Sequence, residues 1–296
     1  MKELVVISGK GGTGKTSVTA SLAVLADRPV IADCDVDAAD LHLVLAPRNT
    51  RRTQFIGGKK ARIMPGHCTA CGKCEELCVF DAITYDGPGN GRFDRTFRID
   101  PIACEGCGVC AWFCAEKAIE FKTVISGEWM VSETRCGPMV HARLGVAAEN
   151  SGKLVSTVRQ EARRIAEEEH RPYIIVDGPP GIGCPVIASV TGADQVLVVT
   201  EPTVAGEHDL GRVLSLTRHF NIDTAVCVNK WDLNPGKTVQ IEEKAKQQGA
   251  RIAGRIRYDR SVTLAQMREQ AVVELESPAA EDIRRLWAML EQGGQK

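Results

Sequence analysis

Five short apolar runs recur along the chain. Each consists mostly of β-branched or other large apolar residues without polar alternation, which is the pattern of strands buried on both faces of a parallel sheet. The runs are Leu4–Ser8, Val30–Asp33, Tyr173–Asp177, Gln195–Thr200 and Thr224–Asn229. We therefore predict five parallel strands.

Helix-like stretches separate these runs or follow the last of them. They are Lys15–Ala26, Gly152–Glu169, Gly206–Phe220, Lys237–Gln248 and Ala279–Glu291. Strands that alternate with helices form right-handed βαβ units, and their helices cover both faces of one sheet. The expected fold class is α/β, with a mostly parallel sheet and helices on both faces.

Residues 57–125 interrupt this alternation. The segment is rich in cysteine and in turn residues. A unit at Cys68–Ile83 is repeated at Cys104–Ile119. We predict a discontinuous α/β domain, residues 1–56 and 126–296, that carries an inserted α+β domain at residues 57–125.

The composition is that of an ordinary globular protein. The formal net charge is −1, so neither nucleic acid nor an anionic membrane is the expected partner. No apolar run approaches the ~18 residues of a membrane-spanning helix. The N-terminus runs from a predicted strand directly into a glycine loop and does not have the pattern of a signal peptide, so a cytoplasmic location is expected.

The loop Gly9–Thr16, GKGGTGKT, has the form G-x-x-x-x-G-K-[ST] and lies between a predicted strand and a predicted helix. In this context backbone N–H groups and the helix N-terminus bind phosphate. We expect Lys15 to reach the β- and γ-phosphates and the Thr16 hydroxyl to bind Mg²⁺. The predicted nucleotide-binding residues of this loop are Gly9, Lys10, Gly11, Gly12, Thr13, Gly14, Lys15, Thr16 and Ser17.

The additional lysine of the loop, Lys10, indicates a family. The form G-K-G-G-x-G-K-T resembles the deviant Walker A loop of the MinD/ParA family of P-loop ATPases, which includes the nitrogenase iron protein. The resemblance implies that ATP and Mg²⁺ bind here and that Lys10 acts in trans on the nucleotide of a second subunit. It also implies slow, partner-stimulated ATP hydrolysis by a homodimer, or by a heterodimer with a paralogous ATPase.

Aspartates follow two predicted strands in the order of this family. Asp35 resembles the switch I residue that aligns the attacking water, and Asp33 or Asp37 is implied to hold Mg²⁺ through water. Asp177 resembles the Walker B aspartate, an outer-shell Mg²⁺ ligand, and Gly178 the glycine near the γ-phosphate. Carboxylates at the carboxyl ends of strands beside a phosphate need a cation between them. The catalytic candidates are Lys10, Lys15, Asp35 and Asp177.

The choice of nucleotide base depends on Asn229 and its neighbours. Asn229 ends a predicted strand where the family places an asparagine against adenine. Residues 229–232, NKWD, also fit the N-K-x-D signature of guanine-binding proteins. The form of the phosphate loop favours ATP over GTP.

Eight of the twelve cysteines form two runs of identical spacing, C-x2-C-x2-C-x3-C. This is the spacing of bacterial ferredoxins, in which the fourth cysteine of each run ligates the other cluster. Zinc is the alternative metal, but it favours two separated C-x2-C pairs. We therefore predict two [4Fe–4S] clusters. Their ligands would be Cys68, Cys71, Cys74 and Cys114 for the first cluster, and Cys104, Cys107, Cys110 and Cys78 for the second.

Four cysteines lie outside these runs. Cys34 and Cys227 are expected to be buried free thiols. Cys184 follows Asp177 at the offset at which the nitrogenase iron protein has a ligand of its subunit-bridging cluster, and Cys136 is the candidate second ligand. Two such cysteines per subunit would give a possible third cluster across a two-fold axis.

The whole chain resembles MinD-superfamily P-loop ATPases that carry an inserted two-cluster ferredoxin domain. The resemblance implies ATP hydrolysis coupled to an iron–sulfur unit and leaves three functions open. The first is nucleotide-driven dimerisation coupled to electron transfer through the clusters to a redox partner protein. The second is an iron–sulfur assembly or carrier ATPase. The third is a MinD/ParA-like positioning ATPase whose clusters sense redox state.

Overall fold

The computed structural model describes residues 1–145 and 151–292. The chain divides into two compact units, each with its own apolar core. The first, called the sheet unit here, contains residues 1–53, 129–143 and the chain from residue 151 onward. The second, called the cysteine unit, contains residues 54–128 and the segment that begins at Leu144.

A nine-stranded sheet, in the order β11-β10-β9-β1-β8-β2-β7-β6-β3, forms the centre of the sheet unit. Seven of its strands pair in parallel, which confirms the predicted α/β sheet. They are β1 (Lys2–Ser8), β2 (Val30–Asp33), β7 (Gly137–Leu144), β8 (Tyr173–Pro180), β9 (Gln195–Thr200), β10 (Asp223–Asn229) and β11 (Arg251–Ile256).

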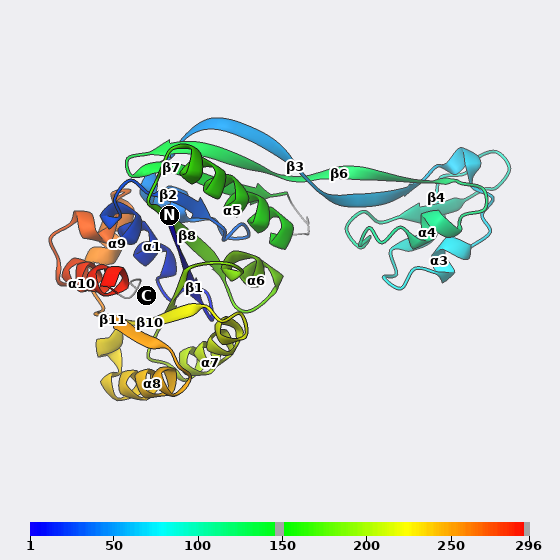
Figure 1. Cartoon of the computed structure of the whole chain (residues 1–296). Helices are drawn as coiled ribbons and strands as arrows, with labels where there is room; N and C mark the ends of the chain where they lie inside the picture. The colour runs from blue at the N-terminus through cyan, green and yellow to red at the C-terminus, as the bar shows by residue number, and fades with distance from the viewer. Residues whose placement is uncertain (146–150, 293–296) are drawn as a thin grey trace. The chain divides into compact units, whose positions relative to one another are not determined.

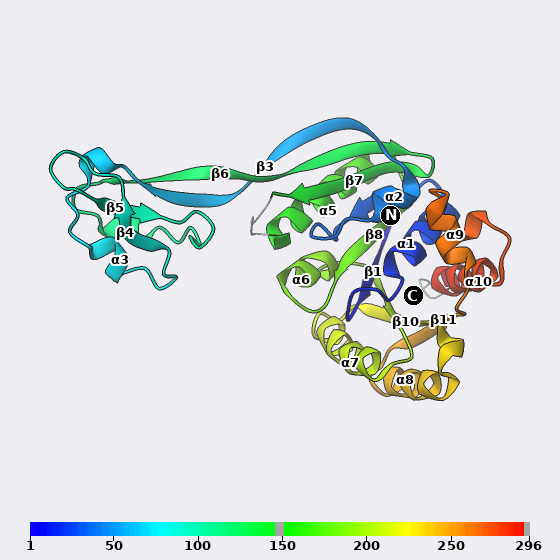
Figure 2. The ribbon, with the colours of Figure 1, turned by 180° about the vertical axis from the view of Figure 1, so that it is seen from behind.

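Helices cover both faces of this sheet, as Figures 1 and 2 show from opposite sides. Apolar side chains of one group of helices form the main core with Leu4, Ile31 and Leu197 of the sheet. That group is α1 (Lys15–Leu25), α2 (Leu41–Leu45), α9 (Ser261–Met267) and α10 (Pro278–Gln292). The other face carries α5 (Ser151–Glu168), α6 (Cys184–Val190), α7 (Val204–His219) and α8 (Pro235–Gln247).

Two parallel strands were not predicted from the apolar pattern. β7 contains His141 and Arg143, and β11 contains Arg251 and Arg255. β11 lies at one edge of the sheet, where a strand is buried less completely and tolerates charged side chains. Polar residues in both strands therefore hide the signal that identified the five central strands.

Two long strands, β3 (Arg48–Ile63) and β6 (Ile119–Thr134), contribute residues to both units. They are neighbours at the other edge of the sheet. The predicted ends of the insertion, Gly57 and Ile125, lie inside these strands rather than in linkers.

The cysteine unit adds a small antiparallel sheet and two short helices. These are β4 (Ile83–Gly87), β5 (Thr96–Ile99), α3 (Lys73–Glu76) and α4 (Val109–Phe113). Each short helix begins after a glycine with positive φ, Gly72 or Gly108. The described residues also contain 3₁₀ turns at Pro65–His67, Trp231–Leu233 and Val272–Glu274.

In the two described ranges, none of the helices combines the length and apolar character that crossing a membrane requires.

A buried ion-pair cluster joins β1 to α5. Glu3 is 2% exposed and accepts hydrogen bonds from Arg159 Nε at 2.7 Å and Arg163 Nε at 2.8 Å. The Arg159 side chain is itself only 6% exposed. Buried charges of this kind are tolerated because each has a partner in place of water.

Replacing Glu3 with alanine should lower the free energy of unfolding by about 3–5 kcal/mol, because Arg159 would remain buried without its anion. The exposed pair of Arg164 and Glu168 provides the control, since breaking a surface ion pair changes stability little. Urea denaturation of Glu3→Ala and Glu168→Ala would compare the two. Equal midpoints would contradict a stabilising role for the buried cluster.

Candidate functional site

The phosphate-binding loop connects β1 to α1 at the carboxyl edge of the parallel strands. Gly12 and Gly14 have φ values of 79° and 87°, a region that favours glycine. A Cβ on Gly14 would lie 2.4 Å from the side-chain nitrogen Nδ2 of Asn229, so the loop packs directly against the end of β10. Together with Asp35 and neighbouring residues, the loop lines a cavity of ≈ 530 Å³.

Asp177 anchors the basic end of this loop. Lys15 Nζ lies 2.8 Å from Asp177 Oδ1 and 3.2 Å from Asp35 Oδ2. The hydroxyls of Thr16 and Thr19 each donate to Asp177 at 2.8 Å. Burial alone would lower the pKa of Lys15, but the two carboxylates raise it above its usual value. The structure therefore brings Lys15, Thr16 and Asp177 together as the sequence predicted.

Asp33 is fully buried at the end of β2. Its Oδ1 accepts the N–H of Asp35 at 3.2 Å, while Oδ2 has no hydrogen-bond partner among the described residues. Burial, and then the charge of Asp177, raise the pKa of Asp33 well above its usual value. Of the two predicted Mg²⁺-associated alternatives, Asp33 lies in this carboxylate cluster, whereas Asp37 is exposed. Buried carboxylates with an unsatisfied oxygen suit a divalent cation and its waters.

Lys10 lies apart from these carboxylates. Its Nζ is 2.5 Å from Glu201 Oε1, and the two side chains are 33% and 16% exposed. Glu201 directly follows β9, the strand beside β1. Sequence reasoning did not single out Glu201, because no motif contains it and the apolar pattern does not reveal the strand order.

A second cavity, of ≈ 270 Å³, adjoins the phosphate loop on the side of Asn229. Asn229 Nδ2 donates to the carbonyl oxygen of Thr13 at 2.7 Å and so ties the loop to β10. Asp232 Oδ1 accepts the N–H of Tyr258 at 2.7 Å, so the carboxylate of the N-K-x-D sequence already has a backbone partner. Residues missed by the sequence analysis complete the lining; they include Ile256, Arg257, Tyr258, Asp259, Val262, Thr263 and Gln266.

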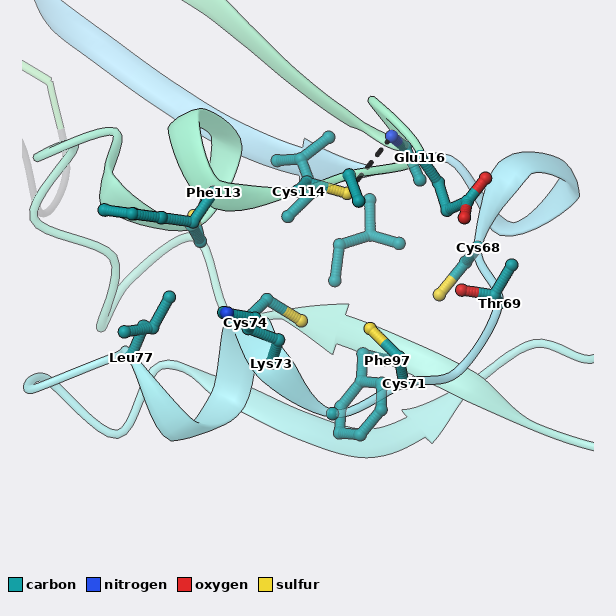
Figure 3. A pocket seen from close by; sticks show the side chains of 16 residues that line it. Cys68, Thr69, Cys71, Lys73, Cys74, Leu77, Phe97, Phe113, Cys114 and Glu116 are labelled. Atoms are coloured by element: carbon teal, nitrogen blue, oxygen red, sulfur yellow. Dashed lines mark hydrogen bonds between the residues drawn. The ribbon is translucent and has the colours of Figure 1, made fainter.

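Two cavities in the cysteine unit are lined by cysteine. The first has a volume of ≈ 160 Å³, and the sulfur atoms of four cysteines face it in Figure 3. The N–H groups of Ala70 and Ala118 donate to two of these sulfurs, at 3.4 and 3.3 Å. The cysteines shown are the ligands predicted for the first cluster, Cys68, Cys71, Cys74 and Cys114.

The second cavity is smaller, at ≈ 20 Å³. Its lining includes the four cysteines predicted for the second cluster, Cys78, Cys104, Cys107 and Cys110. A space of this size holds about one water molecule. The first set of cysteines therefore surrounds room for a bound group, and the second set would have to open to hold one.

The spacing of these thiols does not suit a single metal ion. Over residues 1–145 and 151–292, no three His, Cys, Asp or Glu side chains converge closely enough to hold one ion. All eight cysteines are free thiols. A four-iron cluster spreads its four thiolate ligands more widely than one ion does.

Cys136 and Cys184 lie at opposite ends of the parallel strands. Cys136 directly precedes β7 and packs against the main core. Cys184 begins α6, beyond the carboxyl end of β8, and is exposed. Because β7 and β8 both run parallel to β2, a full strand length separates the two thiols. The predicted subunit-bridging cluster at this pair is therefore wrong, since one two-fold axis cannot gather both cysteines of each subunit.

Comparison with known proteins identifies the fold and the loop. The family described as "CobQ/CobB/MinD/ParA nucleotide binding domain" matches residues 4–272. The chain belongs to this family. Its relatives include the uncharacterized protein MJ0578 of Methanocaldococcus jannaschii, which is 35% identical over 236 residues, or 78% of this chain and 79% of that protein. The septum site-determining protein MinD of Bacillus subtilis is 24% identical over 271 residues, or 88% of this chain and 78% of that protein.

Solved MinD structures share the CobQ/CobB/MinD/ParA fold with this chain. MinD of Pyrococcus horikoshii, complexed with Mg-ADP, has a TM-score of 0.59 at 15% identity and covers 100% of this chain and 99% of its own. The MinC:MinD complex of Aquifex aeolicus has a TM-score of 0.57 at 20% identity and covers 100% and 97%. At these identities the likeness establishes the α/β P-loop fold.

Replacing Asp33 with asparagine should raise the stability of this CobQ/CobB/MinD/ParA family member at pH 7. Because its pKa is raised, native Asp33 binds a proton more tightly than unfolded Asp33, so stability falls as pH rises from about 4 through the raised value. Asparagine lacks this penalty, and we expect a gain of about 1–3 kcal/mol that shrinks toward pH 4.

Urea denaturation at pH 4.5 and pH 7 would measure this change, with the exposed Asp37→Asn as the matched control. Stabilisation of Asp33→Asn by Mg-ATP should be weaker than that of the control. A loss of stability in Asp33→Asn at pH 7 would contradict the assignment of Asp33 as an unsatisfied buried acid.

Proposed function

We propose that this chain is a dimer-forming P-loop ATPase whose cysteine unit binds two [4Fe–4S] clusters and passes electrons to a redox partner protein. The observation that carries the proposal is the presence of two cysteine-lined cavities, which together contain all eight cysteines of the two runs, in a chain of the MinD/ParA nucleotide-binding family. The comparisons support the ATPase part. The cysteine geometry is the support for the clusters.

The sheet unit supplies the groups that phosphoryl transfer needs. Backbone N–H groups of the loop and Lys15 would bind the phosphates, and Thr16 with Asp177 would hold Mg²⁺. Asp35, which lines the same cavity, would align the attacking water. Lys10 of a second subunit provides further positive charge as negative charge spreads over the phosphoryl oxygens. Catalysis of this kind is positioning and electrostatics, so small shifts of these side chains control the rate.

We propose ATP rather than GTP as the nucleotide. Guanine recognition would require Asp232, and its Oδ1 already accepts the Tyr258 N–H, so only part of the carboxylate is left for a guanine ring. Asn229 lines the base cavity beside the loop, where the family places an adenine contact. The MinD of Pyrococcus horikoshii was solved with Mg-ADP, and that nucleotide matches this choice.

In the cysteine unit, the two sets of four cysteines predicted for the first and second clusters would hold them. Bound clusters would supply one-electron transfer to a partner. Burial raises the pKa of Cys74 to about 11, so its ligation requires iron to displace the thiol proton. N–H donors at Ala70 and Ala118 reduce the negative charge on the sulfurs that they contact, which favours the reduced state of a bound cluster.

The comparisons support a second candidate function, a MinD/ParA-like positioning ATPase; in this alternative we propose that the clusters sense redox state. One relative of this chain is the septum site-determining protein MinD of Bacillus subtilis, and MinD of Aquifex aeolicus was solved in complex with MinC. ATP-dependent binding to phospholipid vesicles or DNA, without ATP-dependent reduction of a partner, would favour this function. Delivery of iron and sulfide to an apo-acceptor would instead favour the iron–sulfur carrier.

Protein purified without oxygen should contain about eight iron atoms per chain. Cys71→Ser and Cys107→Ser should each lose about half of this iron, because each removes one ligand of a different cluster. Cys227→Ser is the matched control, since that thiol is buried in the core of the sheet unit. Iron analysis and electron paramagnetic resonance of the reduced protein would measure the loss. Stoichiometric zinc in place of iron would contradict the cluster proposal.

Replacing Lys10 with alanine should leave ATP binding intact but abolish hydrolysis and nucleotide-driven dimerisation, because the lysine acts across the interface. Lys15→Ala should lose ATP binding itself, since that ammonium group lies in the phosphate cavity. Phosphate release and analytical ultracentrifugation would separate these effects. Full turnover by Lys10→Ala would contradict the trans role of Lys10.

A further inference from the structure

Glu201 stands opposite Lys10 in the register of two parallel strands. β1 and β9 pair Leu4 with Gln195 and continue to Ile7 with Val198. Extending this register beyond both strands reaches Lys10 and Glu201, whose charged groups lie 2.5 Å apart. The ion pair therefore joins two residues that follow neighbouring parallel strands of the sheet.

The backbone of Glu201 is fixed by the beginning of α7. Its carbonyl oxygen accepts the N–H of Thr203 at 2.8 Å. A Cβ on Gly206 would lie 2.4 Å from the same oxygen, so the helix approaches as closely as glycine allows. The carboxylate cannot follow Lys10 far without disturbing this helix start.

Glu201 also contacts the other side of the loop. Lys230 Nζ lies 3.4 Å from Glu201 Oε2 and 3.3 Å from the carbonyl oxygen of Gly12. Burial alone would raise the pKa of Glu201, but Lys10 and Lys230 lower it below its usual value. The carboxylate is therefore ionised at neutral pH and attracts both lysines.

We propose that Glu201 is a positioning residue that retains Lys10 within its own subunit until a nucleotide-bound partner competes for the lysine. The inference rests on the proposed trans role of Lys10. One carboxylate carries a single negative charge, whereas a triphosphate presents several, so the exchange of partners favours the dimer only when ATP is bound. Glu201 thereby makes dimerisation depend on the terminal phosphate.

Replacing Glu201 with glutamine should strengthen dimerisation with a non-hydrolysable ATP analogue by about two- to tenfold, because one such pair breaks in each subunit of the dimer. Dimers should also appear with ADP, which the native chain would not support. Glu201→Asp keeps the charge one methylene farther from Lys10 and should shift dimerisation in the same direction by less. This second variant preserves the test if the glutamine variant does not fold.

Glu207→Gln is the matched control, since Glu207 on α7 pairs with Lys237 and Lys244 and not with the phosphate loop. Sedimentation equilibrium would give the dimer dissociation constants, and titration of monomer with Mg-ATP would show that nucleotide affinity is unchanged.

Unchanged or weaker dimerisation of both Glu201 variants would overturn the proposal. The same measurements on Lys10→Ala distinguish a failure of the trans role of Lys10 from a failure of the role of Glu201. If Lys10→Ala still dimerises with the ATP analogue, the trans role has failed; if it does not and the Glu201 variants match the native chain, only the role of Glu201 has failed.

Discussion

The nucleotide site depends on the hydrogen bonds that the carboxylate of Asp177 accepts. This carboxylate is fully buried and accepts hydrogen bonds from Lys15, Thr16 and Thr19, which all lie on the first turns of α1. Asp177 lies on β8, which pairs with β1, the strand that leads into the loop. One buried anion thus fixes the strand, the loop and the helix start relative to one another. Its desolvation is tolerated because three donors replace the lost water.

The two lysines of the loop are held by different kinds of partner. Lys15 is buried between carboxylates that a divalent cation can also bind, so a Mg-nucleotide exchanges one set of ionic contacts for another. Lys10 is partly exposed and paired with Glu201 on the neighbouring strand end. The free protein therefore already satisfies both ammonium groups. Any phosphate group that binds either lysine has to compete with these carboxylates.

The sequence predicted most of what local chemistry determines. Buried strands such as Val30–Asp33 were recognisable because apolar runs have one structural use, and the loop Gly9–Thr16 because few sequences bind phosphate this way. The cysteine spacing placed Cys68, Cys71, Cys74 and Cys114 in one set, and all four line one cavity, which Cys110 of the other predicted set also lines. Glu201 was not recognisable, because its role follows from the order of strands far apart in the sequence.

Other residues escaped for the same physical reason. The expected pairing of Cys136 with Cys184 was wrong because sequence offsets do not reveal which end of a strand a residue occupies. The cavity beside Asn229 carries no motif, since residues from several separate segments of the chain line it. His141 on β7 hid a parallel strand, because a buried polar side chain bonded to Ser132 interrupts the apolar run.

The strands β3 and β6 connect the cysteine unit to the sheet unit, which is its host. They are adjacent in the sheet, and Thr50 Oγ1 donates to the carbonyl oxygen of Val131 where both belong to the sheet unit. A segment that joins two neighbouring strands adds little loop-closure entropy to the folding of its host as it lengthens, because that cost rises only with the logarithm of the loop length. To the host sheet the whole cysteine unit is equivalent to a lengthened hairpin connection. A shorter turn between the same two strands would preserve their pairing, so gain or loss of the cysteine unit would require no change in the strand order of the nucleotide-binding sheet.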